Sequence, residues 1–169
     1  MRVMKFGGTS VATAERLAHV ASLIAGAARH ETTIVVVSAL AGVTDSLAAL
    51  CQRATSRLCV ADEVEAMLRR HLQVLASIGG SADDMRTIAC VLEDLNRELE
   101  ALGAGASCQD ATLDAVLATG ERLSLVLAVA ACARAGLRVV PWDTRRLVRT
   151  DSRFGEATVN AAATRAALS

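Results

Sequence analysis

Apolar and polar positions follow one another in blocks that predict a strand and then a helix. Residues 2–6 form a short apolar run with one lysine, and a Gly-Gly pair follows at 7–8. Apolar residues then recur every three to four positions up to about Arg29, which is typical of an amphipathic helix. The chain is therefore expected to begin with a strand, a glycine bend and a helix that Thr9 or Ser10 caps.

The same order of elements repeats in the next part of the chain. The run TTIVVVSAL (32–40) is β-branched and lacks polar alternation, which predicts a strand that is buried on both faces. Gly42 lies in the loop after it, and Thr44 is placed to cap a helix that continues to about Arg57. A second strand, glycine loop and helix thus follow the first.

Residues 62–102 carry two runs of helical apolar spacing, separated by the sequence GGSADD. The positions with this spacing are Val64, Met67, Leu68, His71, Leu72 and Leu75, and then Ile88, Val91, Leu92, Leu95, Leu99 and Leu102. Ser81 is expected to cap the second helix, with Asp84 in the capping-box position. We predict an antiparallel helical hairpin whose charged faces are solvated and carry no chemistry.

The remaining pattern completes an α/β chain. ATGERLSLVLAVAACARAG (118–136) predicts a helix, LRVVPW (137–142) a strand, and TDSRFGEATVN (150–160) a polar loop before a last helix that begins near Val159. Strands that alternate with helices form a mainly parallel sheet with helices on both faces. The predicted fold is therefore a three-layer α/β/α sandwich.

Composition narrows the class of partner. The 169 residues suit one domain, and the hydrophobic fraction of 53% supports a packed core. The 18 basic residues balance 18 acidic ones, and the aromatic residues are limited to Phe6, Trp142 and Phe154. Binding of single-stranded nucleic acid needs basic residues interleaved with aromatic ones, so we expect no nucleic-acid partner.

Cysteine and histidine spacing argues against disulfides and metal sites. The cysteines are Cys51, Cys59, Cys90, Cys108 and Cys132, an odd number without a C-x-x-C pair. Most lie at helical apolar positions, where a reduced thiol packs as a small hydrophobe. The three histidines, His19, His30 and His71, share no ligand spacing, so no metal site is expected.

The most apolar stretch does not predict a membrane protein. It covers residues 123–137, is interrupted by Arg134, and is shorter than the ~20 residues that a span requires. The first residues lack the pattern of a signal peptide. We therefore expect a cytoplasmic protein with reduced thiols and no membrane partner.

The segment KFGGTS (5–10) has the composition of a phosphate-binding turn. Ligands of parallel sheets lie beyond the carboxyl ends of the strands, which is where Lys5 is placed. Glycines let backbone N–H groups approach an anion, and Lys5 would supply the full charge that phosphoryl transfer needs. A lysine in a buried strand is costly, and a bound anion would offset that cost. A tight turn with a lysine that reaches solvent is the alternative.

Two further segments follow predicted strand ends or open a helix. Ser38, Ala39 and Thr44 belong to the second strand-to-helix junction, where Thr44 as an ordinary N-cap is the alternative interpretation. Glu121 lies in the first turn of the predicted helix 118–136. It either complements the helix dipole or holds an ammonium group of a substrate.

Taken together, four segments resemble the aspartokinases, within the amino-acid kinase family. They are KFGGTSV (5–11), VVVSALAGVTD (35–45), ATGERLS (118–124) and VRTDSRFGEA (148–157), in the family's order. The resemblance covers nearly the whole chain except the predicted hairpin. It implies an amino-acid kinase fold, L-aspartate as substrate, ATP and Mg²⁺ as cofactors, and a homo-oligomer for the complete protein.

The resemblance also implies roles for individual residues. Those in the nucleotide-phosphate segment are Lys5, which is also catalytic, Phe6, Gly7, Gly8 and Thr9. Those around the substrate are Ser38, Ala39, Thr44, Glu121, Arg153 and Phe154. Within this second set Glu121 would hold the α-ammonium group of aspartate, Thr44 would contact the substrate, and Arg153 and Phe154 would edge the site.

Aspartokinases also have a second half of the catalytic domain, with a segment resembling TLGRGGSD, and usually a regulatory region of the ACT type. Neither is found in residues 1–169, so we expect this chain to be the N-terminal portion of a catalytic domain. That second half would bind most of the nucleotide and Mg²⁺. We therefore expect little or no kinase activity from this chain alone.

Two alternatives stay open at this point. A non-catalytic binding or assembly module with the same fold would explain the short chain, although it has no need of Lys5 and Glu121. A kinase for another small substrate is the other alternative, because relatives phosphorylate glutamate, acetylglutamate, uridylate or carbamate. The motifs KFGGTSV and TGERLS favour aspartate.

Overall fold

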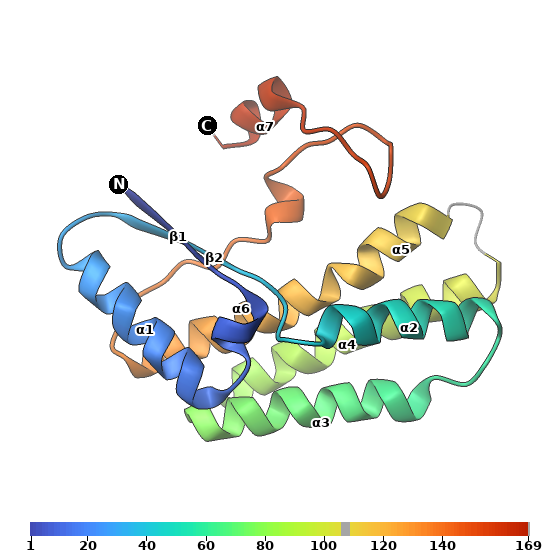
Figure 1. Cartoon of the computed structure of the whole chain (residues 1–169), viewed down its shortest axis with the longest axis horizontal. Coiled ribbons are helices and arrows are strands. Elements are labelled where there is room, and N and C mark those ends of the chain that lie inside the picture. Colours follow the sequence, from blue (N-terminus) through green and yellow to red (C-terminus); the bar gives the residue numbers. More distant parts are fainter. Residues whose placement is uncertain (106–108, 169) are drawn as a thin grey trace.

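The computed structural model describes residues 1–105 and 109–168 as a helical body that carries a small sheet (Figure 1). The strands are β1 (Arg2–Phe6) and β2 (Thr33–Val37). The α-helices are α1 (Ala14–Ala28), α2 (Val43–Thr55), α3 (Ala61–Ile78), α4 (Ala82–Gly103), α5 (Gln109–Leu117), α6 (Thr119–Arg134) and α7 (Ala161–Ala167). Two 3₁₀ turns, η1 (Gly8–Val11) and η2 (Thr144–Arg146), complete the chain.

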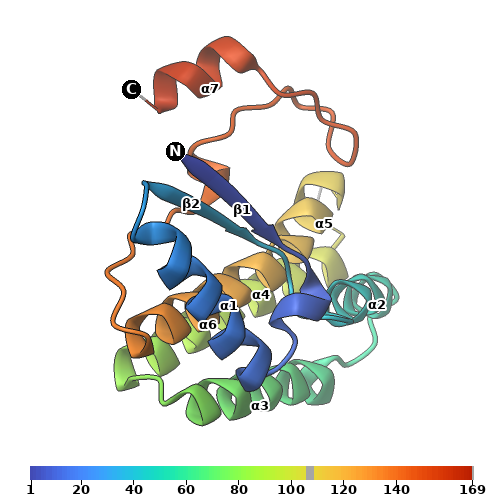
Figure 2. The same cartoon turned by 60° about the vertical axis from the view of Figure 1, so that its left-hand side comes forward.

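The sheet is parallel, and one of its faces is open. β1 pairs with β2 in a register that runs from Arg2–Thr33 to Phe6–Val37. Phe6, Val35 and Val37 pack toward the helical core, whereas Ile34 and Val36 are 46% and 41% exposed on the other face. The expectation that residues 32–40 are buried on both faces is therefore wrong. Alternate side chains of a strand point to opposite faces, and helices α1 and α6 cover only one of them (Figure 2).

The core lies among the helices, with α6 at its centre. Helix α6 packs against α1, α3 and α4, and Leu123 and Leu127 are fully buried. The stretch Asp110–Arg134 is long and apolar enough to cross a bilayer by length and composition, but 56% of its most apolar window is buried inside the protein. That burial is what the central helix of a packed bundle requires.

The hairpin of α3 and α4 agrees with the sequence prediction. Ser81 caps α4: its hydroxyl accepts a hydrogen bond from the Asp84 N–H at 3.1 Å, and the Asp84 carboxylate accepts one from the Ser81 N–H at 2.8 Å. The predicted capping box is therefore confirmed. His71 of α3 is fully buried, and its Nδ1 donates to the Met67 carbonyl at 2.7 Å.

Thiols are distributed as the apolar spacing suggests. Cys51 and Cys132 are buried, and burial raises the pKa of both thiols. Cys59 and Cys90 are exposed and free within the described residues. Cys108 lies outside the described residues.

The chain after α6 forms a polar arm with little core of its own. Residues 137–142 make no strand, so that prediction is wrong; Val140 and Trp142 are 75% and 62% exposed. A strand needs a neighbour to accept its hydrogen bonds, and this segment pairs with neither β1 nor β2. The only bridge in the described arm is antiparallel, between Thr150 and Val159, and α7 follows it near the predicted position (Figure 1).

Candidate active site

Three of the segments singled out above meet at Ala39, directly after β2. The Ala39 N–H donates a hydrogen bond to Glu121 Oε1 at 3.2 Å. The Ala39 carbonyl oxygen lies 2.5 Å from the point that a Cβ on Gly8 would occupy. The Ala39 methyl group lies 2.7 Å from the corresponding point on Gly120. The structure thus brings the glycine bend, the loop after β2 and the start of α6 into direct contact.

Close approach explains why Gly8 and Gly120 have no side chain. A Cβ on Gly8 would meet backbone atoms of Ala39 and Ala41, which have no flexible end that can move aside. A Cβ on Gly120 would also come within 3.2 Å of Val43. The glycine bend and the loop after β2 are also joined by a hydrogen bond of 3.2 Å from the Ala41 N–H to the Gly8 carbonyl. The absence of a side chain at Gly8 is therefore required by the packing of the bend against Ala39 and Ala41, whether or not the bend binds a ligand.

Lys5 lies one residue before the end of β1, on the open face of the sheet. It is exposed and stands opposite Val36 in the sheet register. Its Nζ lies 4.0 Å from the point that a Cβ on Gly7 would take, so the ammonium group turns toward the glycine bend. Among the described residues, no carboxylate forms an ion pair with it. A free cation beside an accessible bend suits an anion such as a phosphate.

Two parts of the reasoning about this bend need correction. Lys5 is not buried, so no bound anion is required to offset a burial cost. The element at the glycine bend is the 3₁₀ turn η1, which begins at Gly8, and α1 begins only at Ala14 with Thr13 as its N-cap. Thr9 and Ser10 belong to η1, where the Ser10 N–H donates to the Gly7 carbonyl at 2.9 Å. The bend thus offers N–H groups of one turn, without the dipole of a long helix.

The loop after β2 holds Ser38 and Ala39 against the sheet. The Ser38 N–H donates to the Phe6 carbonyl at 3.1 Å, which extends the strand pairing by one bond. The N-cap of α2 is Gly42, and Thr44 is exposed one position inside the helix. The interpretation of Thr44 as the N-cap is therefore wrong, since the helix begins at Val43.

Arg153 and Phe154 lie on the polar arm, and the printed partners of Arg153 are residues of the same arm. The Arg153 guanidinium pairs with Asp151 at 3.0 Å and donates to the Thr158 hydroxyl at 2.6 Å. The backbone N–H of Thr158 is the main cause that lowers the pKa of Asp151. The arm is tied to α5 by the Gly155 N–H, which donates to Asp114 at 3.0 Å. The arrangement keeps this loop near α5, with its arginine engaged by its own neighbours.

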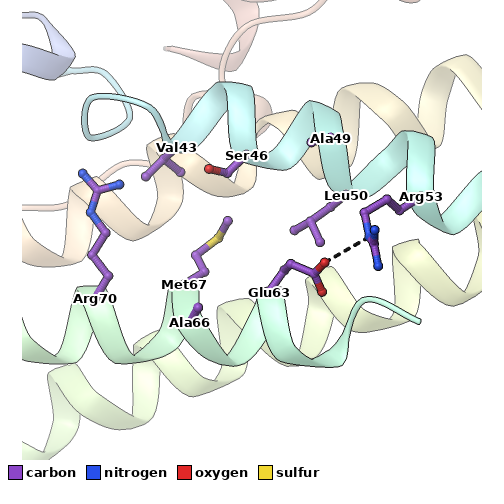
Figure 3. A pocket seen from close by; sticks show the side chains of 9 residues that line it. All are labelled: Val43, Ser46, Ala49, Leu50, Arg53, Glu63, Ala66, Met67 and Arg70. Carbon is purple, nitrogen blue, oxygen red and sulfur yellow. Dashed lines mark ion pairs between the residues drawn. The ribbon is translucent and has the colours of Figure 1, made fainter. Parts of the chain in front are cut away.

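Two hollows lie away from Lys5. One has a volume of about 390 Å³ between α2 and α3, with Val43, Leu50 and Met67 on its walls (Figure 3). The other, of about 250 Å³, is lined by charged residues that include Arg122, whose guanidinium lies 2.5 Å from Asp94. That contact is the main cause of the lowered pKa of Asp94. Lys5 is not among the residues that line either hollow.

Sequence reasoning missed Arg70, which reaches the junction from α3. Its Nη2 donates to the Ala41 carbonyl at 2.8 Å. The two residues are 29 positions apart on elements that no spacing rule relates, so only the folded chain shows the contact. Within the described residues, no cluster of three or more His, Cys, Asp or Glu side chains is arranged to hold a metal ion.

Comparison with known proteins decides the family. Residues 1–168 match the family model described as the amino acid kinase family. The chain belongs to the amino acid kinase family. Relatives include the aspartokinase of Chlamydia muridarum, which is 30% identical over 153 residues, or 90% of this chain and 32% of that protein. Lysine-sensitive aspartokinase 3 of Escherichia coli is 29% identical over 168 residues, or 95% of this chain and 35% of that protein.

Solved structures of this family share the fold. Escherichia coli aspartokinase III in complex with aspartate and ADP superposes with a TM-score of 0.83 at 27% identity, covering 97% of this chain and 36% of that one. Its complex with lysine and aspartate gives the same TM-score at 26% identity, covering 99% and 36%. The α/β fold is thereby confirmed. The chain spans about a third of the length of these aspartokinases.

Proposed function

We propose that this chain supplies the aspartate pocket and part of the phosphate site of an aspartate kinase. The reaction transfers the γ-phosphate of ATP to the β-carboxylate of L-aspartate and gives 4-phospho-L-aspartate, the first step of lysine, threonine and methionine biosynthesis. The observation that carries the proposal is the junction at Ala39, where Glu121 and the glycine bend meet. The aspartokinase relatives, and the aspartate and ADP in the Escherichia coli structure, support it.

Glu121 is suited to hold the ammonium group of aspartate. Its Oε1 accepts the Ala39 N–H, which fixes the orientation of the carboxylate and leaves Oε2 for a substrate. A carboxylate oriented in this way gives a charge-assisted hydrogen bond to an ammonium donor. Ser38, Ala39 and the exposed Thr44 form the adjacent wall.

Lys5 and the bend at Gly7 and Gly8 are suited to the phosphates. The ammonium group is turned toward Gly7, and on this proposal it would supply one full positive charge to the terminal phosphate oxygens of ATP. In phosphoryl transfer the protein acts mainly by positioning and by neutralising charge on these oxygens. Bound Mg²⁺ would add charge neutralisation, and within the described residues no cluster of three or more His, Cys, Asp or Glu side chains is arranged to hold it.

Kinetics of the natural-length protein test these roles. Lys5→Ala should lower kcat by about a hundredfold or more, because a charge is lost where charge develops. Glu121→Gln should raise the KM for aspartate about tenfold and change the KM for ATP little, because the lost charge serves the ammonium group. Arg69→Met, on an exposed arginine that pairs with Glu65, is the matched control. Near-normal constants for both site variants would contradict the proposal.

This chain alone should turn over little or no aspartate. It spans about a third of the length of its relatives, and Lys5 is exposed on the open face of the sheet. An assay that couples ADP formation to NADH oxidation, run on residues 1–169 and on the natural-length protein, measures this directly. Turnover by residues 1–169 on the order of 1–100 s⁻¹, the usual kinase range, would refute it.

A further inference from the structure

The guanidinium of Arg70 connects the helical hairpin of α3 and α4 to the loop after β2. Arg70 of α3 donates to the Ala41 carbonyl at 2.8 Å. The N–H of Ala41 donates to the Gly8 carbonyl, and two residues earlier the N–H of Ala39 donates to Glu121. The loop that Arg70 holds is therefore the one that contacts the glycine bend on one side and Glu121 on the other.

The packing around this contact makes it more than an ordinary surface hydrogen bond. Helices α2 and α3 are separated by the hollow of about 390 Å³, so side chains do not fill the space between them. An Arg53–Glu63 ion pair of 3.0 Å bridges one end of the hollow, and Arg70 stands at the other end, beside Val43 (Figure 3). Arg70 is half-buried, and a hydrogen bond from a charged donor is stronger than a neutral one.

We infer that Arg70 is a positioning residue of the active site and acts through Ala41, an inference that rests on the proposed aspartate kinase function. It fixes the carbonyl of Ala41, and with it the backbone that directs the Ala41 N–H to Gly8 and the Ala39 N–H to Glu121. The inferred role needs no contact between Arg70 and either substrate, since Arg70 acts through its hydrogen bond to Ala41. Small misplacements of such a loop are costly, because about 1 Å of displacement lowers rates by up to about a hundredfold.

The test compares four variants of the natural-length protein. Arg70→Met removes the hydrogen-bond donor but keeps an apolar side chain that lines the hollow. Arg70→Lys keeps the positive charge but replaces the guanidinium by an ammonium group. Arg53→Met removes the bridge at the other end of the same hollow, and Arg69→Met removes the neighbouring exposed arginine. Each is measured for kcat, for the KM of aspartate and ATP, for Tm, and for amide hydrogen exchange over residues 39–43.

Arg70→Met should lower kcat/KM for both substrates by about tenfold or more and speed exchange at 39–43. Arg70→Lys should recover part of the loss. Arg53→Met should lower Tm about as much as Arg70→Met does, but should leave kcat/KM within about twofold of the wild type. Arg69→Met should change neither Tm nor kcat/KM. Equal losses of kcat/KM in Arg70→Met and Arg53→Met, or none in either, would overturn the inference.

Amide exchange separates this inference from the proposed function. If the wild-type protein phosphorylates no aspartate, the proposed function fails. Faster exchange at residues 39–43 in Arg70→Met, but not in Arg69→Met, would then still support the hold of Arg70 on the loop. Unchanged exchange in both variants would contradict the inference that Arg70 fixes the loop, whatever the enzyme activity.

Discussion

Replacing Gly8 by alanine tests the contact on which the site depends. The new Cβ would lie 2.5 Å from the Ala39 carbonyl oxygen, so this oxygen must retreat by about 0.5 Å even to reach 3.0 Å. It cannot do so freely, because Ala39 is buried and its N–H is bound to Glu121. Overpacking of this kind costs about 1–3 kcal/mol. The shift would also disturb the hydrogen bond from the Ala41 N–H to the Gly8 carbonyl, so we expect Gly8→Ala to lie toward the upper end.

Gly7 provides a matched control one residue away. Its backbone is extended, with φ −76° and ψ 168°, which alanine adopts without strain. A Cβ there meets only the flexible end of Lys5, at 4.0 Å. Gly7→Ala should therefore be neutral or stabilising by up to about 1 kcal/mol, since it reduces the entropy of the unfolded chain.

Thermal unfolding followed by circular dichroism separates the two variants. A loss of about 2–3 kcal/mol corresponds to a fall in Tm of roughly 4–12 °C for a chain of this size. Gly7→Ala should remain within a few degrees of the wild type. Equal Tm values for Gly8→Ala and Gly7→Ala would refute the argument that Gly8 is needed for close packing.

Three further predictions concern stability. Burial lowers the pKa of His71 from its ordinary 6.5, so below that pH the imidazole is protonated in the unfolded chain before it is in the folded one. The free energy of unfolding should thus fall as the pH drops below about 6.5, and His71→Leu should flatten that decline in urea titrations at pH 7.5 and 5.5. Leu123→Ala, at a fully buried position, should cost about 2–5 kcal/mol by urea unfolding, and a cost below 1 kcal/mol would contradict the central place of α6. Ser81→Ala should cost about 1 kcal/mol, and an equal Tm for variant and wild type would show that the capping box contributes nothing.

Local pattern was sufficient to predict most of the helices. The capping box at Ser81 and Asp84 follows from side chains that satisfy backbone groups within one turn, so it is visible in the sequence. The positions of Gly8 and Glu121 at strand and helix ends also follow from local order. Only the resemblance to the aspartokinases implied that they belong to one site, and their contact at Ala39 is seen first in the folded chain.

The errors arise where the outcome depends on distant neighbours. Whether residues 32–40 are buried on both faces, or 137–142 pair as a strand, depends on which elements come to lie beside them, and composition does not specify that. Thr13 and Gly42, rather than Thr9 and Thr44, precede the helices, since moving a helix start by two to four residues leaves the apolar spacing of the rest of the helix intact. Arg70 reaches Ala41 only because α3 folds back under the loop after β2.

The open face of the sheet gives Lys5 an unusual setting for a charged group. Val3, Ile34 and Val36 are exposed on the same face, so the ammonium group emerges from a hydrocarbon surface. Water now screens its field. A second wall placed over this face would expel that water, lower the local dielectric constant and strengthen the attraction between Lys5 and an anion several-fold. On the proposed function, the affinity of Lys5 for phosphate would therefore depend on what covers these three side chains.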